Sequence, residues 1–377
     1  MRILTPSIIL ALAACNGSGN TAAPATSGPP FKATPIATLD EPWAMTFLPG
    51  GDMLITEKPG RLLIVSADGK RRTPVSGVPK VAYGGQGGLA DVILHPDYAN
   101  NGYVYLSYAE PGPGGSGTAV ARAKLVTQAG GASRLEGLQV IWRQEPKVSG
   151  EGHYSGRMAF SPDGYLFITS GERQKFTPAQ DMGQNLGKLI RLSDAGGIPD
   201  GNPYYDTGRL RAQVWSSGHR NMLGIAFDGQ GRLWADEMGP RGGDELNLIE
   251  KGGNYDWPIV SNGNHYDGRD IPDHPTRPEF KAPAVFWNPV ISPSSLIFYS
   301  GGMFPEWRGS ALIGGLSSTS LVRVAFDGAK AREADRFPMG RRIREVEQGP
   351  DGAVWLLEDG PGGRLLKLTP AAPRGSD

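Results

Sequence analysis

The chain has 377 residues, among them 55 glycines and 32 prolines, and its 38 lysine and arginine residues balance its 38 aspartate and glutamate residues. So many turn-forming residues leave little room for long helices and favour many short strands. The balanced charge argues against a nucleic-acid-binding surface and favours a small neutral ligand. Because single all-β domains often reach this length, we expect one main domain.

The N-terminus has the features of an export signal. Arg2 supplies a positive charge, and residues 8–14 form an apolar segment that is too short to span a bilayer. Cys15 is the only cysteine of the chain, and residues 12–15 resemble the bacterial lipobox. This predicts a signal peptide over residues 1–15 with lipidation at Cys15, and hence an exported cell-envelope lipoprotein on the periplasmic side of the outer membrane. A chance cysteine in an apolar run is the alternative.

The next segment, residues 16–34, is rich in Gly, Ser, Pro and Ala and has no apolar period. Such a composition is typical of a flexible linker. We therefore expect residues 35–370 to form the folded domain, which must be stable without an internal disulfide because the domain contains no cysteine.

One short pattern recurs through this domain: an apolar residue ends a strand shortly before a Pro or Gly turn, and a second strand follows. The clearest copy is Phe160-Ser161-Pro162-Asp163-Gly164, which precedes a second strand expected over residues 165–169. The copies start at Phe47, Leu94, Phe160, Phe227, Gln348 and, in a degenerate form, Phe304.

Six copies spaced roughly 45 to 77 residues apart are typical of four-stranded propeller blades with variable loops. The sequence therefore predicts an all-β fold, a six-bladed β-propeller. A β-sandwich with hairpins of similar sequence is the alternative.

Polar residues recur at one offset from this pattern. Seven residues before three of the copies lie His153, Arg220 and Arg341, the last with Arg342 beside it, and eight residues before Leu94 lies Gln86. Because a propeller places equivalent residues around one axis, we expect a base, cationic groups and an amide to point into one cavity. Taken singly, each could be an ordinary loop residue.

Carboxylates also recur, at or just after the end of the second strand: Glu57, Glu172, Asp236-Glu237 and Glu358-Asp359. Most are expected to be solvated or paired with an arginine. Glu172 follows the strand that His153 leads into, and a carboxylate beside an imidazole fixes its tautomer and raises its basicity. This pair is a candidate general base.

The segment from Glu237 to Asn247 is dense in glycine and acidic residues, which supply the oxygen ligands that Ca²⁺ prefers. It lacks the EF-hand spacing, and a solvated acidic turn is an equally good interpretation. Tyr255 adds an aromatic hydroxyl nearby.

These segments resemble the PQQ-dependent soluble aldose and glucose dehydrogenases, in which PQQ is pyrroloquinoline quinone, and the similarity runs from about Pro42 to Leu368. The resemblance is carried by residues 86–89 (QGGL), 152–156 (GHYSG), 218–221 (GHRN), 237–245 (EMGPRGGDE), 253–258 (GNYDWP) and 341–345 (RRIRE).

The resemblance implies oxidation of aldose sugars at C1 to lactones. In this reading His153 is the general base, Glu172 orients it, and Arg220 with Ca²⁺ polarises the oxygens of the quinone. Further implied roles are cofactor hydrogen bonds from Gln86 and Asn221, cofactor carboxylate binding by Arg342 and Arg344, a cofactor Ca²⁺ on the carbonyls of Gly239 and Pro240, and a second, structural Ca²⁺ at Glu245 and Tyr255. Trp287 is a candidate wall of the substrate site or a core residue.

Two positions depart from the family pattern. Leu223 stands where many members have a glutamine, and Ser317 stands where they have a lysine. Both changes remove polar contacts to PQQ, so either the affinity is reduced or another group, such as Arg341 or Arg364, fills the place. Glu172 replaces the aspartate of some members and keeps the carboxylate.

Several functions therefore stay open. The first is a sugar dehydrogenase that passes electrons to a quinone or cytochrome in the cell envelope. The second is a propeller oxidoreductase of another alcohol or aldehyde, such as a sorbosone-type substrate, and the third is a non-catalytic propeller that has lost PQQ and binds carbohydrate or protein. A calcium-dependent lactonase fits least, because the sequence shows no suitable cluster of acidic and asparagine ligands.

Overall fold

The computed structural model describes residues 28–127 and 132–371 of the chain. The predicted signal peptide with Cys15 lies outside these residues, as does most of the predicted linker. The first strand, β1 (Phe31–Asp40), begins inside the segment 16–34 that we expected to be flexible. It pairs with the last strand, β26 (Pro361–Pro370), so the boundary predicted at residue 35 is wrong and the folded domain begins at Phe31 or before.

The first half of the domain forms three antiparallel blades. Blade 1 contains β2 (Pro42–Phe47), β3 (Met53–Glu57), β4 (Arg61–Val65) and β5 (Arg72–Ser76). Blade 2 contains β6 (Leu89–Leu94), β7 (Tyr103–Gly112), β8 (Gly115–Val126) and β9 (Ser133–Arg143). Blade 3 contains β10 (Ser155–Phe160), β11 (Leu166–Ser170), β12 (Lys188–Leu192) and β13 (Val214–Ser217).

The second half forms three more blades. Blade 4 contains β14 (Met222–Phe227), β15 (Leu233–Glu237), β17 (Asp244–Leu248) and β19 (Val285–Trp287). Blade 5 contains β20 (Pro293–Phe298), β21 (Ala311–Gly315), β22 (Ser320–Asp327) and β23 (Lys330–Pro338). Blade 6 contains β24 (Ile343–Gln348), β25 (Val354–Glu358), β26 and the N-terminal β1.

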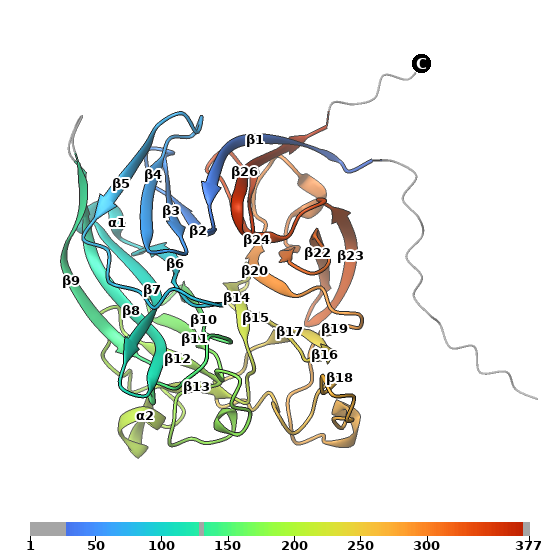
Figure 1. The fold of residues 1–377 in the computed structure, drawn as a ribbon. Coiled ribbons are helices and arrows are strands. Elements are labelled where there is room, and N and C mark those ends of the chain that lie inside the picture. Colours follow the sequence, from blue (N-terminus) through green and yellow to red (C-terminus); the bar gives the residue numbers. More distant parts are fainter. Residues whose placement is uncertain (1–27, 128–131, 372–377) are drawn as a thin grey trace, which may run out of the picture.

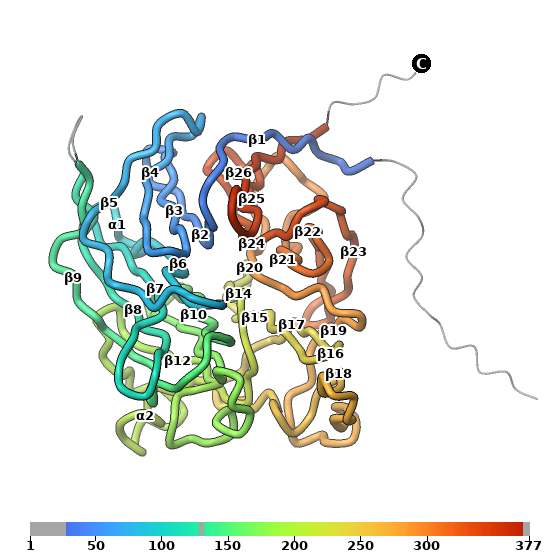
Figure 2. Tube along the Cα trace, in the orientation of Figure 1, coloured from blue at the N-terminus to red at the C-terminus, as the bar shows by residue number. Residues whose placement is uncertain are grey.

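The six blades close into a ring. The innermost strands contact one another in the order β2, β6, β10, β14, β20, β24 and back to β2, and Figure 1 shows them gathered near the middle of the molecule. Blades 1 and 2 are also joined at their outer edges, where β5 pairs in parallel with β9. Figure 2 shows the blue N-terminal strand β1 beside the red C-terminal strand β26, so the two ends of the chain complete the same blade. The prediction of a six-bladed β-propeller is confirmed.

The recurring sequence pattern corresponds to the turn between the first and second strand of each blade. In blade 3 the turn is closed by a hydrogen bond from Gly164 N to Ser161 O at 2.9 Å, and Gly164 has a φ of 85°, which glycine adopts most readily. The second strands β3, β11, β15, β21 and β25 are buried along their whole length, because each blade packs between two others.

The prediction that the sixth copy of the pattern starts at Phe304 is wrong. The innermost strand of blade 5 ends at Phe298, not near Phe304, and its turn is lengthened by an insertion that holds the 3₁₀ helix η4 (Pro305–Trp307). This insertion buries Phe304 and Trp307, whose rings stack 4.3 Å apart. The apolar residues that suggested a strand end are therefore part of the core.

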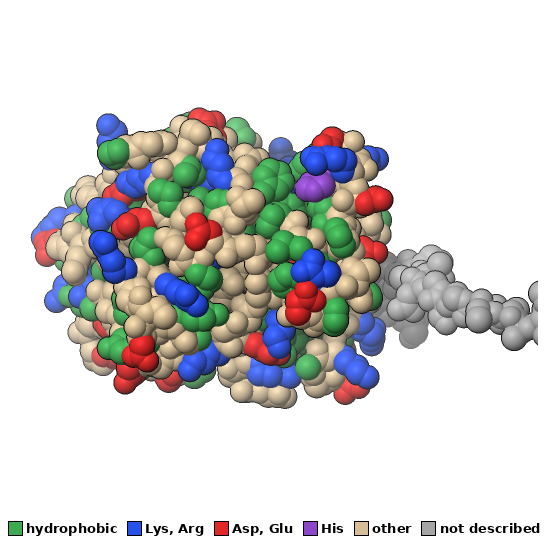
Figure 3. All heavy atoms as spheres, turned by 90° about the horizontal axis from the view of Figure 1, so that it is seen from below, with side chains coloured by type: hydrophobic (Ala, Val, Ile, Leu, Met, Phe, Trp, Pro, Cys, Tyr) green, Lys and Arg blue, Asp and Glu red, His purple; other side chains and the backbone are tan. Residues whose placement is uncertain are grey.

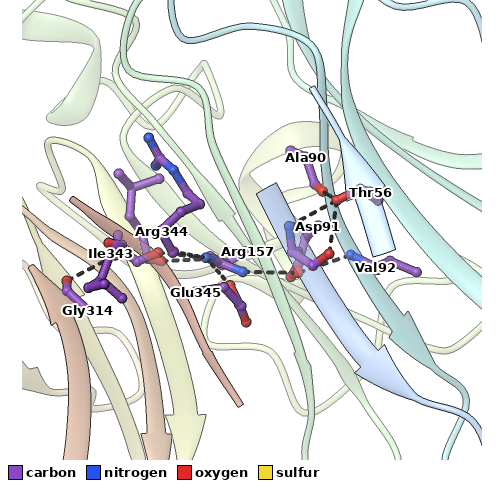
Figure 4. A network of polar contacts seen from close by, with 12 residues as sticks. Thr56, Ala90, Asp91, Val92, Arg157, Gly314, Ile343, Arg344 and Glu345 are labelled. Atoms are coloured by element: carbon purple, nitrogen blue, oxygen red, sulfur yellow. Dashed lines mark hydrogen bonds and ion pairs between the residues drawn. The ribbon is translucent and has the colours of Figure 1, made fainter. Parts of the chain in front are cut away.

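One buried arginine on an innermost strand contacts the five other innermost strands at the centre of the ring. Arg157 on β10 donates from Nε to Leu223 O at 2.8 Å and from Nη2 to Ser294 O at 2.6 Å and Arg344 O at 3.2 Å. Its guanidinium pairs with Asp91 at 3.3 Å and Glu345 at 2.5 Å, as Figure 4 shows, and lies over the ring of Trp43 at 4.1 Å. These partners come from the five other blades.

In the part of the chain that the structure describes, helices are few and short. They are α1 (Tyr98–Asn101), α2 (Arg209–Ala212) and the 3₁₀ helices η1 (Thr177–Ala179), η2 (Tyr205–Thr207), η3 (His274–Thr276) and η4, and a two-residue ribbon of β16 (Arg241–Gly242) and β18 (Gly263–Asn264) stands beside blade 4. Within the described residues, no helix is long and apolar enough to cross a membrane. Basic and acidic side chains are interspersed over the face in Figure 3, as the balanced composition predicts.

Candidate active site

Three adjoining cavities lie where the loops before the innermost strands meet. The cationic cavity has a volume of about 410 Å³, and its charged lining residues are Glu41, Lys58, Arg342, Arg344 and Asp359. The dyad cavity, of about 270 Å³, contains His153, Glu172 and Arg220. A connecting cavity of about 760 Å³ shares Gln86, Met238 and Ser292 with the first, and His153, Arg220 and Tyr266 with the second.

The structure brings together most of the residues that the repeat register selected. Gln86, His153 and Arg220 line the connecting cavity, and Arg342 lines the cationic cavity next to it. Arg341 is the exception, because its side chain turns away and pairs with Glu358 at 3.1 Å.

His153 and Glu172 form a buried pair. Nδ1 of His153 is hydrogen-bonded to Oε1 of Glu172, and the two carboxylate oxygens also accept the backbone N–H groups of Gln174 at 3.0 Å and Phe176 at 2.6 Å. Burial alone would raise the pKa of Glu172, but its hydrogen bonds, above all the one from His153, hold that pKa below its ordinary value. Because an ionised carboxylate only accepts hydrogen bonds, Nδ1 carries the proton and Nε2 is the nitrogen left to act as a base.

The environment also keeps His153 neutral. Burial lowers the pKa of His153, and repulsion from Arg220 adds to this effect, whereas the hydrogen bond to Glu172 opposes it. The net shift is downward, so the imidazole is unprotonated at neutral pH. A neutral imidazole whose tautomer is fixed by a carboxylate is the arrangement that proton abstraction requires.

Arg220 places a cation beside this base. Its Nη1 donates to Met238 O at 2.9 Å, its Nη2 reaches the Tyr266 hydroxyl at 3.3 Å, and its guanidinium lies over the ring of Trp257 at 5.1 Å. Its buried Nε has no hydrogen-bond partner within the described structure. The Arg220 side chain lines both the dyad cavity and the connecting cavity, so its positive charge can attract a negatively charged or carbonyl oxygen there.

The cationic cavity is suited to an acidic ligand. Arg342 and Arg344 both donate to Asp359, from their Nε atoms at 2.7 and 2.8 Å, which fixes the two guanidinium groups side by side. Lys58, in the turn between β3 and β4 of blade 1, pairs with Glu41 at 3.3 Å. Three cations against two carboxylates leave a net positive lining, and the set of groups fits a multiply carboxylated cofactor such as PQQ.

Gln86 lines the cavities, whereas Asn221 is buried behind the cavity wall. Gln86 lines both larger cavities and accepts the backbone N–H of His153 at 2.8 Å, so its amide N–H₂ is the part that a ligand could meet. Asn221 is fully buried beneath the cavity and accepts the backbone N–H and the hydroxyl of Ser155, each at 3.2 Å. In this structure Asn221 holds the cavity wall and does not line the cavity.

The two residues that depart from the family pattern, Leu223 and Ser317, lie in different environments. Leu223 lines the cationic cavity, so the lost glutamine is replaced there by an apolar surface. Ser317 lies on the exposed side of its loop and reaches Val290 O at 3.4 Å. Arg341 and Arg364 both bind Glu358 outside the cavities, so the idea that either one substitutes for the lost contacts is wrong.

Gly239 and Pro240 fit the role of cation ligands. Both line the connecting cavity beside Arg220, and among the described residues neither backbone carbonyl accepts a hydrogen bond. A Cβ on Gly239 would lie 2.4 Å from Gly242 O, so the tight turn that aims these carbonyls requires glycine. Backbone carbonyls are ligands that Ca²⁺ accepts readily.

The residues expected to hold a second Ca²⁺ are already engaged. The Tyr255 hydroxyl donates to Leu248 O at 2.6 Å and accepts Glu250 N at 2.8 Å. Between Glu245 and Asp256 lies the imidazole of His274, with its nitrogens 3.2 and 3.1 Å from the two carboxylates. Across the described ranges, no group of three or more acidic, His or Cys side chains is arranged to hold a metal ion. As arranged here, Glu245 and Tyr255 do not fit a calcium site.

Trp287 is a core residue. It is 5% exposed, packs in the cluster between blades 4 and 5, and donates from Nε1 to Glu333 at 2.6 Å. The aromatic residues that do line the dyad cavity are Phe176, Trp257 and Tyr266, and the sequence pattern assigned a role to none of them. Tyr266 lies in a long loop whose conformation the sequence pattern does not determine.

Comparisons with known proteins agree on one family. Residues 39–367 match the family described as glucose / sorbosone dehydrogenase. The chain is 41% identical over 341 residues to the aldose sugar dehydrogenase of Escherichia coli (strain K12), covering 88% of this chain and 91% of that protein.

Solved structures of the same kind superpose well. A glucose dehydrogenase crystal structure has a TM-score of 0.86 at 42% identity, covering 90% of this chain and all of the other. The PQQ-bound aldose sugar dehydrogenase of Streptomyces coelicolor has a TM-score of 0.73 at 28% identity, covering 91% of this chain and 99% of the other.

Proposed function

Because the chain belongs to the glucose / sorbosone dehydrogenase family, we propose that it oxidises aldose sugars at C1 to lactones, with PQQ and Ca²⁺ as cofactors. The observation that carries this proposal is the buried His153–Glu172 pair beside Arg220, in cavities that open onto a cationic cavity. A module that only binds carbohydrate has no need of a base with a fixed tautomer next to an arginine.

The proposed reaction breaks the C1–H bond and the O–H bond of the anomeric hydroxyl, and forms the lactone carbonyl. PQQ, when bound, supplies the acceptor for the hydride that leaves C1. His153 takes the hydroxyl proton at Nε2, while Glu172 keeps the proton of Nδ1 in place and stabilises the imidazolium that forms. The Arg220 guanidinium lines the same two cavities as His153, where its positive charge would stabilise negative charge as it develops.

The remaining residues would bind the cofactors. Arg342 and Arg344, held by Asp359, would pair with cofactor carboxylates, and Lys58 adds a third cation. Gln86 would donate its amide N–H₂. The carbonyls of Gly239 and Pro240 would hold a Ca²⁺ that supplies a Lewis acid at the site.

We also propose that the chain is exported and lipidated at Cys15, and that it passes its electrons to a quinone or cytochrome of the cell envelope. The support is the lipobox-like sequence of residues 12–15. Labelling with radioactive palmitate should mark the wild-type chain and not the Cys15→Ser variant. Equal labelling of both would contradict the proposal.

The activity is tested by reconstitution. The chain from residue 16 onward is mixed with PQQ and Ca²⁺, and dye reduction is followed with a panel of aldoses and, separately, other alcohols and aldehydes of the sorbosone type. We expect sugar-dependent reduction that is lost in His153→Ala and kept in His95→Ala, a matched histidine that lines none of the three cavities.

Other outcomes would contradict the proposal in distinct ways. If PQQ binds in a calorimeter and only non-sugar substrates are oxidised, the substrate class is wrong. If PQQ does not bind, Leu223 and Ser317 have abolished the site, and a non-catalytic propeller is the better account.

A further inference from the structure

The dyad cavity has an aromatic wall that none of the proposed catalytic steps uses. Phe176 and Tyr266 both line it, and they are 44% and 73% exposed. Large exposed aromatic side chains are few among the described residues, and two of them flank the same small cavity. Exposed apolar surface at a cavity mouth usually marks a place where a ligand is covered.

The aromatic rings are held in a defined arrangement. The Phe176 ring stacks on Trp257 with a centroid distance of 5.6 Å and an interplanar angle of 28°. Trp257 in turn packs against the Arg220 guanidinium, whose Nη2 reaches the Tyr266 hydroxyl at 3.3 Å. One face of Phe176 is thus occupied and supported from behind, while much of the ring stays accessible.

The backbone ties this wall to the catalytic base. Phe176 has a φ of 64°, a left-handed conformation that bulky residues rarely adopt. Its N–H donates to Oε2 of Glu172 at 2.6 Å, and the other oxygen of the same carboxylate holds His153. The carboxylate that orients the base therefore also fixes the position of the aromatic ring relative to that base.

The charges around the cavity cancel. Arg220 and Arg269 are matched by Glu172 and Asp267, so the lining favours a neutral ligand. A pyranose ring is neutral, presents hydroxyl groups at its edge and has an apolar C–H face that can cover an aromatic ring. Gln174, Asp267 and Arg269 supply polar groups that can meet the hydroxyls.

We propose that Phe176 and Tyr266 form the subsite that binds the pyranose ring of the substrate and directs its C1 hydroxyl to His153. The inference rests on the proposed sugar oxidation and identifies the residues that select a ring-shaped aldose. It makes Phe176 a substrate-binding residue whose ring, not its backbone, carries the contact.

The test separates sugar binding from cofactor binding and from catalysis. Phe176→Ala and Tyr266→Ala are compared with Tyr205→Ala, a control whose aromatic ring is equally 44% exposed but lies on η2, away from the three cavities. In the reconstituted enzyme we expect each of the first two variants to raise KM for an aldopyranose roughly 10-fold, because each removes one stacking surface. The PQQ Kd should stay within about 2-fold, and Phe176→Trp should restore the low KM.

A second measurement covers the case in which the wild-type protein oxidises no sugar. Binding of a 1,5-anhydro sugar, which lacks the reactive hydroxyl, is measured by calorimetry on the same variants. Binding that is lost in Phe176→Ala and Tyr266→Ala but kept in Tyr205→Ala supports the subsite even if the proposed oxidation fails. Sugar oxidation with unchanged KM in both variants, or a KM rise matched by an equal rise in the PQQ Kd, would overturn the subsite.

Discussion

Nδ1 of His153 is hydrogen-bonded to Oε1 of Glu172, and both side chains are almost fully buried. This contact fixes which nitrogen of the imidazole faces the cavity. It also raises the pKa of His153 against the larger downward effect of burial. The pair therefore sets both the geometry and the pH range of the proposed reaction.

The first prediction concerns pH. The acid limb of kcat/KM should reflect protonation of His153 and lie below the ordinary value of 6.5, because burial and Arg220 lower the pKa of His153. In Glu172→Gln the upward contribution of the carboxylate is lost, so the limb should move to still lower pH. The rate at neutral pH should fall by about 10- to 100-fold, because the tautomer is no longer held by a charge. A pH–rate profile checks both, and a limb that moves upward would contradict the assignment.

The second prediction concerns Arg157. Replacing it by Met leaves the buried carboxylates Asp91 and Glu345 without their cation, and loss of one partner from a buried pair costs about 3–5 kcal/mol. We expect urea unfolding to show a loss of this size. Arg191→Met is the matched control, because Arg191 is also buried but its acidic partner Asp163 is exposed.

Arg157→Met also tests whether Arg157 shapes the cationic cavity in addition to stabilising the fold. Arg157 binds the carbonyls of Leu223 and Arg344, and both residues line the cationic cavity. Arg157→Met should therefore also weaken PQQ binding, and Glu345→Gln added to it should recover part of the stability but not the PQQ affinity. Recovery of both together would show that Arg157 acts on the cavity only through stability.

The third prediction concerns Asp236 at the buried centre of blade 4. Burial raises the pKa of Asp236 to about 8, with Asp244 and Glu237 adding to the shift and Arg157 opposing it. The folded state thus keeps a proton that the unfolded chain releases above its ordinary pKa of 3.8. The free energy of unfolding should fall as the pH rises toward 8, by about 1.4 kcal/mol per pH unit from this group. Asp236→Asn should remove that slope, and a constant difference between the two proteins from pH 5 to 8 would contradict this account.

Much of the fold and part of the site could be predicted from the sequence, because a propeller converts sequence offset into position. The offset seven residues before the strand end correctly brought His153 and Arg220 to one cavity. Other site residues recur at fixed offsets in the same way. Lys58, Met238 and Asp359 each lie eleven residues after the start of a copy of the pattern, and all three line the cationic cavity. Asp91, Arg157 and Glu345 share the offset of three residues before the strand end and meet at the centre.

Other residues of the site do not recur at a fixed offset from the repeated pattern. Arg341 was misplaced because its side chain pairs with Glu358, and Arg342 and Arg344 line the cationic cavity in its place. Phe176, Tyr266 and His274 lie in loops between strands, where no period links sequence to position. Their contacts are made with residues far away in the chain, so only the folded structure reveals them.

The last prediction concerns His274, which lies between the carboxylates of Glu245 and Asp256. The family resemblance implied a structural Ca²⁺ in this region, at Glu245 and Tyr255. If the imidazole takes the place of that cation, removing Ca²⁺ with EDTA from the PQQ-free wild-type protein should leave its Tm nearly unchanged. His274→Ala should lower the Tm in EDTA, because two buried carboxylates then face each other across a vacated space, and added Ca²⁺ should restore it by binding there. His95→Ala should show no such dependence on Ca²⁺. A wild-type Tm that falls steeply in EDTA would mean instead that Glu245 and Asp256 bind Ca²⁺ with His274 displaced.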